Sequence, residues 1–125
     1  NACLDISHAE YLAFMDDDEM ARPGWLKALF LALESTGATV ALGPVHALYA
    51  PSAPEWLKKG NFHSTYPVWV KGRIITGYSC NVLFRKNAPS VEGKRFDIAL
   101  GKTGGEDTQF FSEIYHAGGT ITYSA

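Results

Sequence analysis

The sequence has little of what marks several large classes of protein. Its two cysteines, Cys3 and Cys80, lie far apart, so neither a disulfide framework nor a zinc site is indicated. Lysine and arginine form no run and the net charge is only −2, which argues against a nucleic-acid partner. The apolar runs are short for a membrane span, and nothing resembles a signal peptide. These absences predict a cytoplasmic protein with reduced thiols.

What the chain does have is enough apolar sequence for one small domain. It is 125 residues long and 46% of them are hydrophobic, so it can bury a core and is not disordered. No internal repeat or low-complexity segment divides it. Because it begins at Asn1 rather than at Met and ends at Ala125 directly after a strand-like run, we expect a piece of a longer protein.

The most distinctive stretch joins a short apolar run to consecutive acids. Residues 11–15 (YLAFM) predict a buried strand, and Asp16, Asp17, Asp18 and Glu19 follow at once. Two like charges about 4 Å apart repel by roughly 4 kcal/mol at an effective dielectric constant near 20. Such a cluster needs full solvation, a proton or a cation, and aspartate oxygens suit Mg²⁺ or Mn²⁺. A solvated turn before a helix and a metal-binding loop are both compatible with this pattern.

The remaining pattern alternates helices with strands. We expect helical residues at 1–9, 23–37, 55–59 and 106–118, and strands at 39–48, 73–76, 81–85 and 120–123. Gly37 and Gly118 are the expected helix C-caps, and Thr103 with Glu106 matches a capping box. Gly43-Pro44 interrupts the strand at 39–48, which implies a bulge or a place at the edge of the sheet.

Two loops stand out between these elements. Residues 50–72 carry Trp56, Phe62, Tyr66 and Trp69, which form either an exposed sugar-stacking or lid surface or a cover for the core. We favour the cover for the core, because it is the simpler interpretation. Residues 87–105 form a connection of a length that is usually functional or mobile.

A second acidic site, Glu106-Asp107, follows two glycines at the start of a predicted helix. Acids are common at this position because the helix dipole stabilises them. Alternatively, Gly104 and Gly105 let a substrate approach the backbone, and the carboxylate acts as a general base.

Two other possible sites are not supported by the sequence. Gly101-Lys102-Thr103 lacks the earlier glycine of a phosphate-binding loop, and the four histidines show no ligand spacing.

Taken together, these motifs resemble those of family 2 glycosyltransferases of the GT-A fold. The resemblance rests on YLAFMDDDE, RPGWLKAL, TGYSCNVLFR and RFDIALGKTGGEDTQFFSEIYHAGGTITYSA, in this order. A narrower resemblance is to bacterial enzymes of exopolysaccharide assembly, such as the succinoglycan glucosyltransferases. The family resemblance implies an α/β, partial GT-A-like (nucleotide-diphospho-sugar transferase) fold with a mixed sheet flanked by helices. Residues 1–125 would be the catalytic, C-terminal part of one domain, without its N-terminal nucleotide-binding half.

The resemblance also implies roles for individual residues. Asp16 and Asp18 match the ends of the family's Asp-x-Asp motif, so Asp18, with Asp16, would hold the Mg²⁺ or Mn²⁺ that bridges the donor diphosphate. Asp107 matches the catalytic base of inverting members, and Glu106 is the second choice. The residues expected to contact the nucleotide sugar are Asp16, Asp17, Thr76, Gly77, Gly104 and Gly105.

The implied activity is the inverting, metal-dependent transfer of a sugar to a saccharide or lipid-linked saccharide acceptor during polysaccharide synthesis. The donor would be a nucleotide-diphosphate sugar, with a UDP-sugar as the first candidate. The parent enzyme would act in the cytoplasm, with room for peripheral association at the inner face of the plasma membrane. We expect the 125-residue piece alone to be weakly active or inactive, and to self-associate through exposed sheet edges and apolar surface.

Two alternatives remain. One is a nucleotidyltransferase that makes nucleotide sugars, whose related architecture also uses acids and Mg²⁺. The other is a non-catalytic carbohydrate-binding module that uses Trp56, Tyr66 and Trp69.

Overall fold

The computed structural model describes all 125 residues, and its centre is a four-stranded sheet. The strands lie in the order β1 (Tyr11–Met15), β5 (Asn81–Arg85), β2 (Val40–Leu42) and β6 (Ile121–Tyr123). Strand β5 runs antiparallel to both of its neighbours, whereas β2 and β6 are parallel. The predicted mixed sheet is therefore confirmed.

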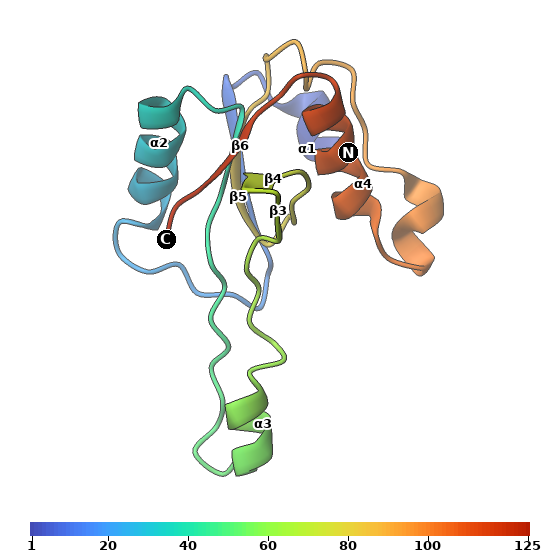
Figure 1. Cartoon of the computed structure of the whole chain (residues 1–125). Helices are drawn as coiled ribbons and strands as arrows, with labels where there is room; N and C mark the ends of the chain where they lie inside the picture. Colours follow the sequence, from blue (N-terminus) through green and yellow to red (C-terminus); the bar gives the residue numbers. More distant parts are fainter.

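Helices cover both faces of this sheet, which gives three layers (Figure 1). Helix α2 (Trp25–Thr36) packs Leu29 and Leu33 on one face, against Ala41 and Leu83. Helix α4 (Glu106–His116) packs on the other face, where the core consists chiefly of Val40, Leu42, Val82, Phe84, Phe110, Phe111 and Ile114. Successive strand residues point to opposite faces, so the unbroken apolar runs of β2 and β5 require a helix on each side.

Smaller elements complete the chain. These are α1 (Ala2–Ile6), α3 (Glu55–Gly60), the hairpin of β3 (Trp69–Val70) and β4 (Arg73–Ile74), and the 3₁₀ helix η1 (Ile98–Lys102). The predicted cap of α2 is confirmed, since Gly37 is its C-cap with a φ of 66°. The C-cap of α4 is Ala117, and the predicted Gly118 follows it with a left-handed φ of 94°. No helix combines the length and the apolar character needed to cross a bilayer.

Three local predictions are wrong. The strand at 11–15, expected to be buried, is the edge strand β1 and has no fully buried residue, because only β5 pairs with it. The strand expected at 39–48 ends at Leu42, and β2 lies inside the sheet rather than at its edge. The Gly43 N–H donates to the Asn81 carbonyl at 2.9 Å, but Pro44 has no N–H with which to continue the ladder. The capping box is also absent, because Gly105, with a φ of 96°, is the N-cap of α4 and no side chain caps this helix.

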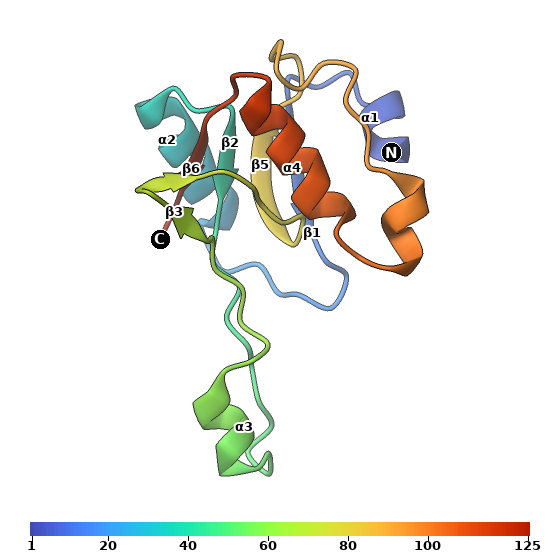
Figure 2. The ribbon, with the colours of Figure 1, turned by 45° about the vertical axis from the view of Figure 1, so that its right-hand side comes forward.

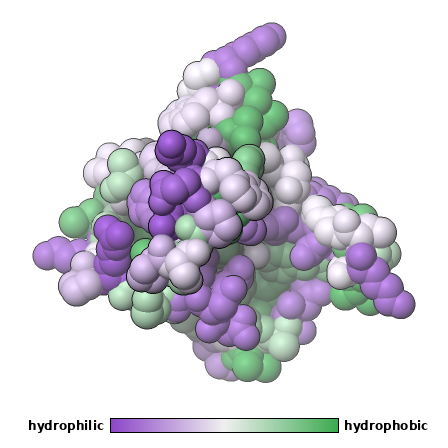
Figure 3. Space-filling view, turned by 90° about the horizontal axis from the view of Figure 1, so that it is seen from below, coloured by the Kyte–Doolittle hydropathy of each residue, from purple (hydrophilic) through white to green (hydrophobic).

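Between β2 and β3 the chain leaves the sheet as an arm, residues 45–66, with α3 at its tip (Figures 1 and 2). Val45 and Thr65 close its base by exchanging backbone hydrogen bonds of 3.0 and 2.9 Å. The view from below shows hydrophilic and hydrophobic residues interspersed (Figure 3).

The expectation that the aromatic residues of this region cover the core is wrong. The exposed side chains include all four of them, Trp56, Phe62, Tyr66 and Trp69. The physical reason is the path of the backbone, because the arm carries Trp56 and Phe62 away from the sheet (Figure 1). Tyr66 lies at the base of the arm, and Trp69 lies in the small separate hairpin.

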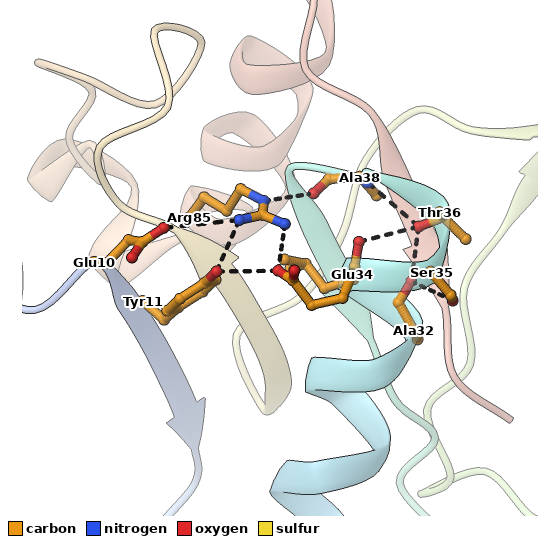
Figure 4. A network of polar contacts seen from close by, with 9 residues as sticks. Glu10, Tyr11, Ala32, Glu34, Ser35, Thr36, Ala38 and Arg85 are labelled. Atoms are coloured by element: carbon orange, nitrogen blue, oxygen red, sulfur yellow. Dashed lines mark hydrogen bonds and ion pairs between the residues drawn. The ribbon is translucent and has the colours of Figure 1, made fainter.

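At the amino end of β1 a polar network joins α2 to the sheet (Figure 4). The Arg85 guanidinium donates to the Tyr11 hydroxyl at 2.8 Å and to the Ala38 carbonyl at 3.2 Å. It also donates to the Glu34 carboxylate at 2.5 Å and pairs with Glu10 at 3.8 Å. The carboxylates of Glu10 and Glu34 at this end of the sheet are therefore paired with the guanidinium of Arg85.

Candidate functional site

The register of two strands brings the first acidic site beside a loop that is distant in sequence. Met15, the last residue of β1, lies opposite Asn81, the first residue of β5. Since these strands are antiparallel, Asp16 follows β1 at the same edge where Cys80 precedes β5. Burial raises the pKa of the Cys80 thiol to about 11, and the nearby carboxylates of Glu19 and Asp16 contribute.

The acids after β1 form a turn that concentrates negative charge. The Glu19 N–H donates to the Asp16 carbonyl, and the Glu19 carboxylate accepts from the Asp16 N–H, both at 3.2 Å. Burial raises the pKa of Asp16, and the charges of Asp18, Asp17 and Asp107 raise it further. None of the ion pairs in the structure involves residues 16–19. The cluster therefore has no ion-pair partner in the chain, and the nearest cation of the cavity wall, in sequence, is Arg22.

The second acidic site is held against the same loop. One Asp107 carboxylate oxygen accepts from the Thr108 N–H at 2.7 Å, and the other accepts from the Ser79 N–H at 3.4 Å. The Thr76 hydroxyl donates to the Thr108 carbonyl at 2.7 Å. These bonds fix the start of α4 on the segment that leads into β5. They also bring Asp107 close enough to Asp16 for its charge to raise the pKa of that carboxyl.

The glycines predicted to contact the donor have different roles. A Cβ on Gly77 would lie only 3.0 Å from the Phe111 ring and 3.1 Å from a Leu42 methyl, so this glycine lets the loop pack against α4. Gly104 and Gly105 are exposed, with φ of 80° and 96°, and open space lies where their side chains would be. They make the turn into α4 and leave its backbone accessible to a ligand.

A cavity of about 880 Å³ lies beside the acids. This volume lies within the range of roughly 300–1,000 Å³ that is usual for small-molecule sites. Asp16, Asp18 and Glu19 contribute to its wall, as do Tyr49 and His63 of the arm. The hydroxyl of Tyr49 is buried without a hydrogen-bond partner, so it remains available to a ligand.

Not every predicted residue reaches this cavity. Its wall lacks Asp17, Thr76, Gly77, Gly104, Gly105, Glu106 and Asp107. The charge of Asp107 thus raises the pKa of Asp16, but the Asp107 side chain does not line the cavity.

Sequence reasoning missed a buried amide that organises the cavity. The Trp25 indole N–H donates to the Asn81 side-chain oxygen at 2.7 Å, and the Asn81 amide donates to the Pro44 carbonyl at 2.9 Å. Asn81 therefore joins α2, β5 and the loop after β2, all of which line the cavity. A Cβ on Gly43 would lie 2.5 Å from the Asn81 amide nitrogen, so the glycine makes room for it. The available signal was a single asparagine at the head of the apolar run of β5.

The acidic residues fit a divalent cation such as Mg²⁺ that takes only part of its ligands from the protein. No group of three or more His, Cys, Asp or Glu side chains lies close enough to hold a metal unaided. Mg²⁺ commonly keeps several waters and binds one or two carboxylates together with substrate phosphates. The uncompensated carboxylates of Asp16 and Asp18, side by side in the cavity wall, match that requirement.

Comparison with known proteins decides the family. The family model described as "Glycosyl transferase family 2" matches residues 1–89. The chain belongs to glycosyl transferase family 2. It is also 54% identical over 124 residues to the succinoglycan biosynthesis protein ExoM of Rhizobium meliloti (strain 1021). That alignment covers 99% of this chain and 40% of the relative, so the chain spans about two-fifths of the relative's length. No solved structure matches.

Family 2 membership confirms the resemblance predicted from the sequence motifs, including its narrower form, the similarity to succinoglycan biosynthesis proteins. The family implies a GT-A fold, and the mixed sheet between two helical layers agrees with it. The matched range contains the acidic turn and Thr76-Gly77, whereas Glu106 and Asp107 lie beyond residue 89.

Proposed function

We propose that this family 2 chain belongs to a glycosyltransferase that transfers a sugar from a nucleotide-diphosphate sugar to a saccharide acceptor. The transfer inverts the configuration of the anomeric carbon. A UDP-sugar is the first candidate for the donor, and a bacterial polysaccharide is the product. Family membership supports the reaction class, and the similarity to a protein named for succinoglycan biosynthesis supports the product class.

One observation carries the proposal at the level of residues. Asp16 and Asp107, which are far apart in sequence, lie at the same end of the sheet, close enough for their charges to interact. A transferase of this kind needs one carboxylate site near the leaving diphosphate and another near the attacking hydroxyl, and the proximity of Asp16 and Asp107 supports that division of roles.

Asp107 is our candidate for the general base. Its carboxylate would take the proton from the acceptor hydroxyl while that oxygen attacks the anomeric carbon. The bonds from Ser79 and Thr108 hold the carboxylate in one orientation, as base catalysis requires. Glu106 is the second candidate, because one of its carboxylate oxygens is buried without a hydrogen-bond partner. A single displacement inverts the anomeric centre, so no enzyme nucleophile is needed.

Asp18 and Asp16 would hold the divalent cation, Mg²⁺ or Mn²⁺. When bound, the cation would offset the negative charge that builds up on the departing diphosphate. Asp17, Thr76, Gly77, Gly104 and Gly105 remain proposed contacts of the nucleotide sugar. Thr76 and Gly77 act in any case through the loop that holds Asp107, since they pack it against α4.

Donor binding tests this proposal in the full-length protein. Isothermal titration should show UDP binding in the presence of Mn²⁺ and little without it. Asp18→Asn should weaken that binding at least tenfold, because it removes one of the two carboxylates offered to the cation. Glu92→Gln changes an exposed acid outside the cavity and serves as the matched control. Equal UDP binding by all three proteins would contradict the assignment.

The alternatives predict other results in the full-length protein. A nucleotidyltransferase would release pyrophosphate from a nucleoside triphosphate instead of transferring a sugar. A carbohydrate-binding module would bind glycans through the exposed Trp56, Tyr66 and Trp69 without metal, and Asp18→Asn would leave that binding intact.

A further inference from the structure

The arm defined above, residues 45–66, presents apolar side chains that no part of the chain covers. Leu48, Trp56 and Phe62 are 75%, 67% and 70% exposed. Helix α3, at the tip, contains no buried residue. Such exposure is unusual for tryptophan and phenylalanine, which bury large apolar surfaces when they can.

Two of these aromatic rings share one face of α3. Gly60 lies four residues after Trp56 and therefore on the same side of the helix. A Cβ on Gly60 would lie 2.1 Å from the Phe62 ring, so that ring rests directly over Gly60. Trp56 and Phe62 thus lie on the same side of the arm's tip.

Lysines accompany this pair. Lys58 is held in place, since its ammonium donates to the Pro51 carbonyl at 2.9 Å and pairs with Glu55 at 3.3 Å. Lys59 is exposed and makes no ion pair. The arm contains two lysines and one glutamate, whereas the remainder of the chain has nine basic and twelve acidic residues. The arm is therefore net positive on a negatively charged body.

The arm is also preformed. Beyond the Val45–Thr65 bonds, the Ser64 hydroxyl accepts from the Ala47 N–H at 2.9 Å and donates to the Asn61 side chain at 2.6 Å. His46 and the Tyr66 hydroxyl are hydrogen-bonded at 3.0 Å. A surface that is already ordered loses little conformational entropy when it binds.

We propose that the arm is a peripheral membrane anchor that docks on an anionic lipid surface. Trp56 and Phe62 would enter the headgroup region, where amphipathic aromatic rings are favoured, and Lys59 would face the lipid phosphates. A second copy of the chain is a poorer occupant, because a stable dimer buries roughly 1,200–2,000 Å² and α3 has only 6 residues.

The inner part of the arm connects this anchor to the cavity. His46, Tyr49 and His63 belong to the arm and also line the cavity beside Asp16 and Asp18. Docking of the tip would therefore keep the cavity near the membrane, where a lipid-linked saccharide acceptor would be found. This consequence rests on the proposed function, but lipid binding by the arm does not.

Vesicle sedimentation tests the anchor without donor, metal or turnover, so its outcome is independent of the proposed reaction. The probe is phosphatidylcholine vesicles with about a third phosphatidylglycerol, compared with phosphatidylcholine alone. We expect binding to the anionic vesicles only, and weaker binding at high salt. Trp56→Ala should weaken binding about tenfold. Lys59→Gln should weaken it about fivefold.

Matched controls lie outside the arm. Trp69→Ala removes a tryptophan that is 57% exposed in β3, and Lys102→Gln removes an exposed lysine of η1. Both variants should bind as the unchanged chain does. Because Trp56 and Lys59 are exposed, their variants should keep the same circular dichroism and melting temperature. Quenching of tryptophan fluorescence by brominated phosphatidylglycerol, retained in Trp69→Phe, would place Trp56 in the bilayer without disturbing the arm.

Three results would overturn the proposal. The first is an absence of binding to anionic vesicles. The second is equal weakening by Trp56→Ala and Trp69→Ala. The third is a Trp56→Ala variant that binds vesicles normally but loses self-association in sedimentation velocity, which would make the arm a contact between copies.

Discussion

The two ends of strand β1 treat negative charge in opposite ways. At its amino end Glu10 and the facing Glu34 share the Arg85 guanidinium, which also lies 5.3 Å from the centre of the Tyr11 ring (Figure 4). At its carboxyl end Asp16 and Asp18 have no cationic partner, and the pKa of Asp16 is raised. The first arrangement stabilises the fold, whereas the second costs stability unless something outside the chain compensates it. Proteins keep such local costs chiefly where they serve a function.

The largest effect on activity should follow from changing Asp107 of the second acidic site, which lies at the same end of the sheet as Asp16. In the full-length protein, Asp107→Asn should lower turnover by about 10²–10⁴-fold, because the acceptor hydroxyl loses its base. Donor affinity should stay close to its original value, so kcat falls while donor binding measured by titration does not.

The control for that experiment lies at the compensated end of β1. Glu34→Gln makes the same kind of change but should leave turnover intact at a temperature where the variant is folded. Normal turnover in Asp107→Asn would remove this residue as the base and leave Glu106 to be tested.

Loss of the compensating cation should give the next largest effect. Arg85→Met should lower the free energy of unfolding by about 2 kcal/mol, because several hydrogen bonds to charged groups are lost together. Denaturant titration measures this difference. Arg95→Met breaks a single exposed pair with Asp5 and should cost less than about 1 kcal/mol. Equal losses in the two variants would mean that the network is no more than a set of independent surface pairs.

Addition of a divalent cation should partly compensate the negative charge at the carboxyl end of β1 and so stabilise the fold. At ten times its dissociation constant, Mn²⁺ should stabilise the chain by about 1.4 kcal/mol, seen as a rise in melting temperature. Asp18→Asn should lose most of this gain, and Arg85→Met should keep it. A Mn²⁺ effect that persists undiminished in Asp18→Asn would move the cation site elsewhere.

The smallest effect concerns pH. Because the pKa of Asp16 is raised in the folded protein, its contribution favours folding in acid and is lost as the pH rises through that raised value. Asp16→Asn should therefore stabilise the metal-free chain at neutral pH by a few tenths of a kcal/mol, since the site is exposed. The gain should disappear as the pH falls toward about 4, the ordinary range for aspartate. A constant gain at every pH would show that charge is not its cause.

Local patterns in the sequence were sufficient for most of the secondary structure. Tyr11–Met15, α2 with its cap at Gly37, α3 and Asn81–Arg85 all form close to where their patterns indicate. The failures concern surroundings that lie elsewhere in the chain. Whether β2 is internal depends on β5 and β6, and whether Trp56 is buried depends on the path of the whole arm.

The candidate site divides in the same way. Asp16, Asp18 and Asp107 stand out as acids beside a strand end or a helix start, and this much is visible in the order of residues. Asn81 and Tyr49 do not stand out, because an isolated asparagine or tyrosine has no local pattern that marks it. Their importance comes from neighbours contributed by other elements.

By itself the sequence determined which segments become helices and strands and which carboxylates are crowded, because both depend on residues a few positions apart. Only the tertiary structure decided that the turn after β1 lies near the start of α4, close enough for the charge of Asp107 to raise the pKa of Asp16. This proximity requires the antiparallel register of β1 with β5 and the bonds from the Thr76–Ser79 loop to Asp107 and Thr108. The same is true of the arm, whose exposure follows from the direction in which the chain leaves the sheet at Pro44.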